Sequence, residues 1–351
     1  MSTTGFARSL IAFNPSPRRW PIAVAAGLSM AVPVAVGALA GRTDLGLLAS
    51  LGAFTSLYFG AEPRRRRLRL LPVVALALVA VAALGALVAP SHPATLVGLA
   101  AVAVASAVGT VATRLGPPGA IMFILVFGIS AQLTGPISSG GAGVAPGPLL
   151  GLLAAGCVAA YLISALVMSI PAVRWPAAAA AFATPRRRDP IDATDRLSVA
   201  RQVMASLLGV GLVTVIGEPR GYWVVGASVA ILSIGHRHRV TVVRAVHRIT
   251  GTVVGVGVFA LLALLHPQGI WLALLFGVLQ FVIELVVIRH SALALTFITP
   301  LVLLLLSAAH PGSAGRIAVE RLVDTGWGAL IAVLVLGIVP ARWFRERTAQ
   351  P

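Results

Sequence analysis

Twelve long apolar runs divide this chain of 351 residues, and they constrain its fold more than any other feature. Most approach the length that an α-helix needs to cross the hydrocarbon core of a bilayer. They fall in two sets of six, at residues 22–40, 45–59, 72–89, 95–113, 121–133 and 149–170, and at residues 203–216, 222–234, 249–265, 270–288, 293–309 and 322–339. The first run is longer than the apolar region of a secretory signal peptide, so we expect it to be retained.

The runs predict helices rather than strands, because they lack polar–apolar alternation and are joined by short connections with Gly and Pro. The chain is 58% hydrophobic and has a mean hydropathy of +0.97. A soluble domain of this size cannot cover that much apolar surface. We therefore predict an all-α, polytopic membrane helix bundle of about twelve transmembrane helices, with the lipid bilayer as its surroundings.

All 27 basic residues are arginine, and they gather on alternate connections. With the N-terminus inside, 23 arginines fall on inner segments and four on outer segments. The stretch EPRRRRLR at residues 62–69 then becomes a cytoplasmic loop beside anionic lipid headgroups. This bias predicts a multi-pass protein of the cell (plasma or inner) membrane with cytoplasmic N- and C-termini. It also argues against nucleic acid as the partner of the net charge of +17.

The two sets of runs resemble each other at an offset of about 175–178 residues, as in the Ala-Ser pairs at 49–50 and 227–228. Six is an even number, so the two copies would have the same orientation, related by a pseudo-twofold axis along the membrane normal. The expected organisation is a cytoplasmic tail (1–19), a first six-span repeat (20–170), a cytoplasmic linker (171–198), a second six-span repeat (199–341) and a cytoplasmic tail (342–351).

The second run of each set, 45–59 and 222–234, is short. We interpret both as crossings, because a re-entrant first segment would place the arginines of residues 62–69 outside. Short segments at matching places of two repeats point to a transport path. Local thinning of the bilayer, or a short buried helix, is the alternative interpretation.

Glu284 is an acidic residue within a span, where a carboxylate is costly. Gly277, Gln280 and Glu284 recur at helical spacing, so they share a small and polar face that should line the interior of the bundle. Two interpretations stay open for Glu284: a structural ion pair with Arg244 or Arg248, or a proton-exchanging carboxylate beside a path.

Asp324 lies three residues after Arg321 at the start of the last run. An ordinary ion pair at a helix N-terminus is one interpretation, and a proton relay with Glu284 is the other. Tyr222 and Trp223 open a short run, either as interfacial anchors or as lining of a path. Gly251 and Gly255 form a GxxxG pair, which predicts close helix packing.

Enzymatic chemistry has little support in the sequence. Lysine is absent, which excludes a Walker A loop and Schiff-base catalysis, and there is no nucleophile–base pair or metal-ligand spacing. The histidines at 236, 238 and 247 stand among arginines, which disfavours a metal site. We expect no enzyme activity, no cofactor and no metal.

Three patterns occur in order in the second half: Tyr-Trp at Tyr222, Arg-x3-Arg-x2-Gly-Thr-x2-Gly from Arg244, and Arg-x2-Asp-Thr-x2-Gly from Arg321. Together they resemble the FUSC family, the fusaric-acid-resistance and aromatic-acid-exporter group of membrane proteins. The resemblance covers about residues 222–340, and the first half matches only as a degenerate repeat. It implies ion-gradient-driven efflux of aromatic or amphipathic organic anions. Many relatives also carry a large soluble domain, where this chain has a short linker.

We therefore expect an exporter of small organic anions. Arg244, Arg248, Arg289 and Arg321 are the candidate anion contacts, and Glu284 or Asp324 would carry a proton. Its protein partner would be a second copy of the chain or an accessory export subunit. The alternative is a non-transporting scaffold that binds lipid headgroups or a partner through basic loops. A polar cavity between the repeats that reaches Glu284 would favour the exporter.

Overall fold

A computed structural model of the chain describes residues 10–15, 19–60, 62–170, 191–218, 220–233, 238–309 and 312–341. All regular secondary structure in these ranges is helical, which confirms the all-α prediction. Residues 171–190 of the predicted linker, and 1–9 and 342–351 of the predicted tails, lie outside the described residues.

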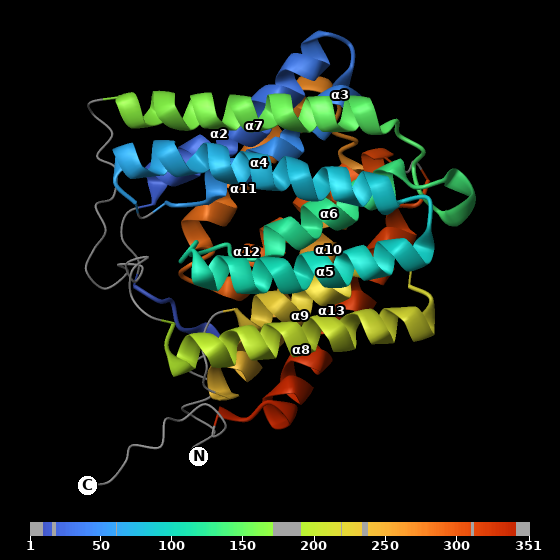
Figure 1. The fold of residues 1–351 in the computed structure, drawn as a ribbon. Helices are drawn as coiled ribbons and strands as arrows, with labels where there is room; N and C mark the ends of the chain where they lie inside the picture. Colours follow the sequence, from blue (N-terminus) through green and yellow to red (C-terminus); the bar gives the residue numbers. More distant parts are fainter. Residues whose placement is uncertain are drawn as a thin grey trace, which may run out of the picture.

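Nine helices in the described part of the chain are long and apolar enough to cross a membrane, so this is a multi-pass membrane protein. They are α2 (Trp20–Leu39), α4 (Arg64–Val88), α5 (His92–Ala112), α7 (Pro146–Ser169), α8 (Ala193–Ile216), α10 (His238–Leu264), α11 (Gly269–Val286), α12 (Ser291–Ala309) and α13 (Ala314–Ile338). In Figure 1, α4, α5, α7 and α8 run roughly side by side across the front of the view.

The remaining predicted runs form shorter helical segments: α3 (Thr43–Ser50) continued by the 3-10 helix η1 (Leu51–Leu57), α6 (Ile121–Thr134) and α9 (Tyr222–Leu232). A further 3-10 turn, η2 (Ile137–Ser139), follows α6. Every residue of η1 and α9 is buried. The 11 residues of α9 extend only about 16 Å, roughly half the hydrocarbon thickness. Protein rather than lipid surrounds these segments, the condition under which short segments are stable at membrane depth.

Several helices begin before their apolar runs. Residues 64–69 were predicted as a loop, which is wrong, because α4 begins at Arg64. Likewise α10 begins at His238 and α13 at Ala314, so Arg248 and Arg321 lie inside helices. Arginine is a good helix former and its long side chain can reach polar partners, so a basic segment continues a helix beyond its apolar run.

The two halves of the chain pack together through reciprocal pairs of helices. Helix α11 packs along α2, α5 packs along α8, and the short helices α6 and α9 contact each other. Within the second half, α10 packs on α12, where a Cβ atom on Gly251 would lie 2.4 Å from the Ala292 carbonyl oxygen. A Cβ on Gly255 would lie 2.7 Å from the Thr299 Cβ, so the predicted close packing is confirmed.

The connections gather at two ends of the bundle. We call the end that holds the connections after η1, α5 and α11 the arginine-rich end, and the other the far end. In Figure 1 the connections after α4, α6 and α8 lie at the right, which is the far end, while the end of α7 and the start of α8 lie at the left.

Candidate functional site

The three sequence patterns of the second half come together in space. Tyr222 and Trp223 begin α9, Arg248 lies on α10, and Arg321 and Asp324 lie on α13. These three helices pack on one another. All five side chains are buried, Trp223 and Asp324 completely. We call Arg248, Arg321, Asp324 and Trp223 the buried charge cluster.

The buried charge cluster lies near mid-depth in the bundle. Arg248 follows the first residue of α10 by ten positions, and Asp324 follows the first residue of α13 by ten. At 1.5 Å per residue, each is roughly 15 Å from an end of its helix. The two helices start at different ends, and both charged side chains are buried within the protein.

The charges of the cluster are not neutralised among themselves. Arg321 interacts electrostatically with both Arg248 and Asp324. None of the ion pairs among the described residues joins Arg321 to Asp324, so the predicted ordinary pair is wrong. Neither carboxylate oxygen of Asp324 accepts a hydrogen bond from the described residues. An incompletely paired buried charge costs free energy, so the cluster is suited to receive a ligand.

Hydrogen-bond donors outnumber acceptors around the cluster. The buried atoms that lack a partner among the described residues include Nε of Arg248 and of Arg321, the indole nitrogen of Trp223 and the hydroxyl groups of Tyr222 and Thr252. The matching acceptors are the two oxygens of Asp324. A surplus of donors with two guanidinium groups is the chemistry that binds an oxyanion.

Aromatic contacts connect the cluster to the first half of the chain. The Arg321 guanidinium lies over the Trp223 ring, 4.9 Å from its centroid, and the Tyr222 and Trp223 rings meet edge to face at 5.7 Å. The Tyr222 ring packs against Gly128 of α6, where a Cβ atom would lie 2.0 Å from the ring. Only glycine allows Tyr222 to insert between the two halves.

A cavity of about 190 Å³ opens beside Tyr222 at the far end of the bundle. Its wall combines residues of α5, α6 and the connections after α6 and α8. His92, Gln132, Glu218 and Tyr222 supply polar groups, and Gln132 donates a hydrogen bond of 2.5 Å to the Gly140 carbonyl. The cavity lies between the two halves, but Glu284 does not line it.

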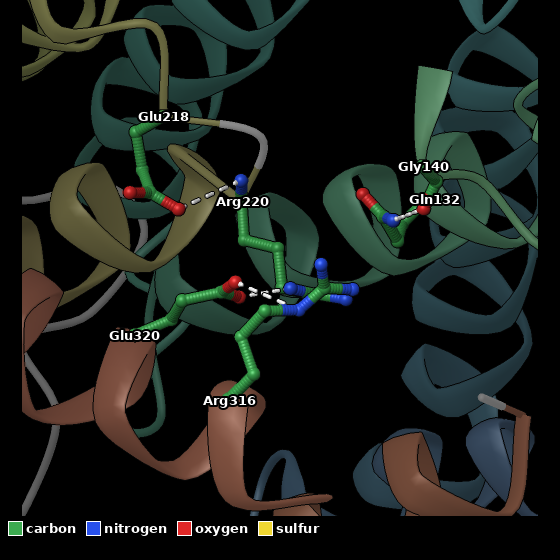
Figure 2. A network of polar contacts seen from close by, with 6 residues as sticks. All are labelled: Gln132, Gly140, Glu218, Arg220, Arg316 and Glu320. Carbon is green, nitrogen blue, oxygen red and sulfur yellow. Dashed lines mark hydrogen bonds and ion pairs between the residues drawn. The ribbon is translucent and has the colours of Figure 1, made fainter. Parts of the chain in front are cut away.

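Next to this cavity, the connection after α8 is tied to α13 by an ionic network (Figure 2). The Glu320 carboxylate pairs with the buried guanidinium of Arg220 and, at 3.6 Å, with Nε of Arg316. Glu218 accepts a hydrogen bond from the Arg220 backbone N–H. Burial raises the pKa of the Glu218 carboxyl, and the negative charge of Glu320 contributes to the rise.

Two other predicted anion contacts lie outside the cluster. Arg244 is half-buried and donates a hydrogen bond of 2.8 Å to the Ala230 carbonyl near the end of α9, and its charge acts on Arg248. Arg289 is exposed at the arginine-rich end, so the structure does not bring it to the buried charge cluster.

Glu284 pairs with a residue that the sequence did not indicate. Its Oε2 accepts a hydrogen bond of 2.8 Å from Arg19, which precedes α2, and the buried Arg67 interacts with it electrostatically. The predicted partners, Arg244 and Arg248, were wrong.

Gln280 is buried on the same face of α11 as Glu284, and Gly277 lies at a close crossing where its Cβ would be 2.8 Å from that of Ala31. Gly277 therefore packs against α2, and neither Gln280 nor Gly277 lines the described cavity.

Sequence reasoning missed the network of Arg220, Glu320 and Arg316. One signal was present: Arg316, Glu320 and Asp324 recur every four residues, which places three charges along one face of a helix in a membrane protein. Nothing in the sequence indicated that Arg220, in a short connection, would be completely buried against this stripe.

Comparison with known proteins agrees with the resemblance seen in the sequence. Residues 207–335 match the family described as "Fusaric acid resistance protein-like", and this range includes the whole buried charge cluster. Over 132 residues the chain is 30% identical to the "Uncharacterized membrane protein YvaC" of Bacillus subtilis (strain 168). That alignment covers 37% of this chain and 21% of the relative, so the chain spans about a fifth of the relative's length. No solved structure matches the chain.

Proposed function

We propose that this chain, which belongs through residues 207–335 to the fusaric acid resistance protein-like (FUSC) family of membrane proteins, is an ion-gradient-driven exporter of small aromatic or amphipathic organic anions. A transporter-like role follows from the family and from the many apolar helices. The substrate class, the driving force and the direction of flux are the proposal.

The observation that carries the proposal is the buried charge cluster. Two guanidinium groups and one carboxylate lie near mid-depth, and several buried donors there have no hydrogen-bond partner among the described residues. Transporters commonly place substrate sites near the bilayer midplane. An organic carboxylate would satisfy Arg248 and Arg321, and its apolar part would lie against Trp223.

A succession of polar groups supports a route through the second half. From the far end it passes the cavity, Tyr222, Trp223 and Arg321, and then Arg248 and Arg244 toward the arginine-rich end. Exposed arginines at that end would raise the local concentration of anions. Arg244 and Arg248 would be the first residues of the bundle that an entering anion meets.

Asp324 is the better of the two candidate proton carriers. Its carboxylate oxygens have no hydrogen-bond partner among the described residues, so a proton can bind there without breaking an existing bond. Glu284 remains the second candidate, but it would first have to leave its ion pair with Arg19.

Matching contacts in the two halves support the proposed twofold repeat. Arg67 donates hydrogen bonds to the carbonyls of Ser56 and Tyr58 at the end of η1, as Arg244 does to Ala230 at the end of α9. Each half also packs its Ala-Ser segment on a glycine of its last helix, Gly156 or Gly328. Reciprocal packing of α2 with α11 and of α8 with α5 fits a pseudo-twofold relation.

The proposed orientation places the arginine-rich end in the cytoplasm, with both termini there, in the plasma (inner) membrane. Arg64, Arg65, Arg66 and Arg69 are exposed around the first turns of α4, where they can contact anionic headgroups. The same observation favours the alternative function, a scaffold that binds lipid headgroups, and so does the absence of Glu284 from the wall of the described cavity.

An efflux assay in intact cells tests the proposal. Cells that express the chain are loaded with labelled aromatic carboxylates, and the retained label is followed over time. We expect the wild type to lower retention of at least one acid, and Arg248→Gln to abolish the effect. Asp44→Asn is the control, because Asp44 is exposed at the far end and pairs there with the exposed Arg42.

If no acid in the panel leaves faster with the wild-type chain than without it, the exporter is contradicted and the scaffold is favoured. If Arg248→Gln exports as well as the wild type, export occurs but the buried charge cluster is not its site. Glu284→Gln, compared in the same cells, decides whether Glu284 has any role in proton coupling.

A further inference from the structure

Two histidine rings stack at the arginine-rich end, away from the buried charge cluster. His247 lies on α10 and His290 directly precedes α12, and their ring centroids are 4.8 Å apart with planes inclined by 25°. His247 is buried, and His290 is half-buried. Neither histidine has a part in the proposed transport route.

Both rings bind the same backbone atom of the N-terminal segment. Nε2 of His247 lies 2.9 Å from the Leu10 carbonyl oxygen, and Nε2 of His290 lies 3.1 Å from it. A carbonyl oxygen can only accept, so each Nε2 must carry the hydrogen. One acceptor therefore holds two histidine donors.

The other nitrogen of each ring is then left to accept. Nδ1 of His247 lies 2.8 Å from the Ser291 hydroxyl, and Nδ1 of His290 accepts the Leu293 backbone N–H at 3.2 Å. Each ring thus uses one donor and one acceptor, which is the complete capacity of neutral imidazole. The arrangement fits two uncharged histidines.

Further contacts fix the same segment, residues 10–15. The Phe13 ring lies 5.0 Å from the His290 ring, and the Asn14 backbone N–H donates to the Arg289 carbonyl at 2.9 Å. The segment contains no charged residue. It is therefore held to the arginine-rich end by the two histidines, one ring contact and one backbone hydrogen bond.

Protonation of His290 would disrupt this arrangement directly. His290 caps the N-terminus of α12, because its Nδ1 accepts the Leu293 N–H, and a proton on Nδ1 would face that N–H. The positive end of the α12 dipole also disfavours a cation there. The Ser291 hydroxyl can rotate to tolerate a protonated His247, but two charged rings in contact repel.

The charges around the pair add to this repulsion. The groups that act on His247 are His290 and Arg244, both positive when charged, and the exposed Arg289 adjoins His290 in the chain. A proton added to either ring therefore meets positive charge. Histidine is the side chain that ordinarily titrates between about pH 5 and pH 8.

We propose that His247 and His290 form a pH-sensitive latch that holds residues 10–15 on the arginine-rich end when both rings are neutral and releases them when the rings are protonated. In the proposed orientation the arginine-rich end faces the cytosol, so the latch would sense cytosolic pH. The latch itself does not depend on transport. It would give the protein a response to cytosolic acidification beside the inner mouth of the proposed route.

A distance measurement tests the latch. Nitroxide labels on Ile11→Cys and Val240→Cys, in a Cys157→Ser background that removes the only native cysteine, report the separation of the segment from α10 by electron paramagnetic resonance. Both labelled positions are exposed, so the labels displace no packed side chain. The detergent-solubilised full-length chain is used, so that both ends are at the same pH and failure of export does not affect the result.

We expect one narrow distance distribution at about pH 8 and a broad one at about pH 5.5. Release takes up two protons. The ratio of docked to released segment should therefore fall by up to about a hundredfold for each unit by which the pH is lowered within the titration range. His247→Gln should reduce this to about tenfold. In His247→Gln/His290→Gln the amide N–H groups replace both Nε2–H donors and neither side chain titrates, so pH dependence should disappear.

His266→Gln is the matched control, because His266 is exposed in the connection after α10 and should leave the wild-type response unchanged. A wild-type distribution that stays narrow at pH 5.5 overturns the proposal. A double variant that retains the wild-type pH response overturns it equally, since release would then depend on other groups.

Discussion

Arg321 has two properties that suit it to bind an anion. It is buried against the ring of Trp223, and its Nε has no partner among the described residues. A guanidinium that lies over an aromatic ring can still donate hydrogen bonds along its edges to a carboxylate.

We predict that Arg321→Gln weakens binding of the transported anion by roughly 10- to 100-fold, because hydrogen bonds to charged groups contribute about 1.5–3 kcal/mol each. Equilibrium binding of a labelled aromatic carboxylate to purified protein measures this change. Arg289→Gln is the control, since Arg289 is exposed at the arginine-rich end. Equal affinities of Arg321→Gln and the wild type would remove Arg321 from the site.

Glu218 gives a prediction about pH. Burial raises its pKa in the folded state, so the folded protein binds this proton more tightly than the unfolded chain does. The contribution of Glu218 to stability is therefore most favourable below its ordinary pKa of about 4.5 and falls as pH rises through the folded-state value. Glu218→Gln should raise the melting temperature at pH 7, and the difference should shrink near pH 4. A constant difference across this range would contradict the assignment.

Single residues were predictable where helical spacing decides their position. Gln280 and Glu284 were assigned to an interior face, and both are buried. The partner of Glu284 was not predictable, because Arg19 is 265 positions away in the chain and is brought close only by the packing of α2 on α11. Arg67 was predicted to lie in a loop, but its side chain is buried. A run of arginines indicates a charged surface, and nothing in the run indicates which one of its arginines is buried.

At the scale of elements, the short segments form the interior of the bundle. Every residue of η1 and α9 is buried, and each segment is followed by an arginine that donates to carbonyls near its end. These arginines satisfy backbone groups that lipid could not. The longer helices surround the short ones and expose apolar side chains such as Val73, Leu76 and Leu166.

The crossing of α10 and α12 depends on the absence of a side chain at Gly251. Gly251→Ala would place a Cβ atom 2.4 Å from a backbone oxygen, so the helices must separate, at a cost of about 1–3 kcal/mol. We expect a lower melting temperature in detergent. Gly257→Ala, on the same helix with nothing within 4 Å, should be neutral or stabilising. Equal melting temperatures for the two variants would contradict the proposed packing.

The existence and type of every long element were predictable from the twelve apolar runs, because the length of an apolar segment is set by the bilayer. The starts of α4, α10 and α13 were not, since arginines that border a run can continue its helix. The change from α-helix to 3-10 helix between α3 and η1 had no sequence signal. The segment η1 packs against α7 and α2, contacts that the local sequence does not indicate.

For the whole molecule, the unequal distribution of arginines predicts which end faces the cytoplasm. Cysteine substitutions in a Cys157→Ser background test this in intact cells with a thiol reagent that cannot cross the membrane. Ser139→Cys, in the exposed connection after α6, should react, and Arg65→Cys, exposed on the first turn of α4, should react only after the cells are opened. The reverse pattern would invert the proposed orientation and the direction of export.

The candidate site was predictable only in part. The sequence patterns identified Trp223, Arg248, Arg321 and Asp324, but not that they share one cluster, because α13 is separated from α9 and α10 by α11 and α12 along the chain. The cavity was not predictable at all, since its wall depends on how α5 and α6 of the first half meet the connection after α8.

The most direct test of the account is transport by the purified protein in liposomes. With an imposed pH gradient, the wild type should accumulate a labelled aromatic carboxylate. Asp324→Asn should exchange internal for external substrate without accumulating it, because the binding arginines remain and the proton carrier is lost. Accumulation by Asp324→Asn equal to that of the wild type, or no movement of any tested acid by the wild type, would contradict the central claim.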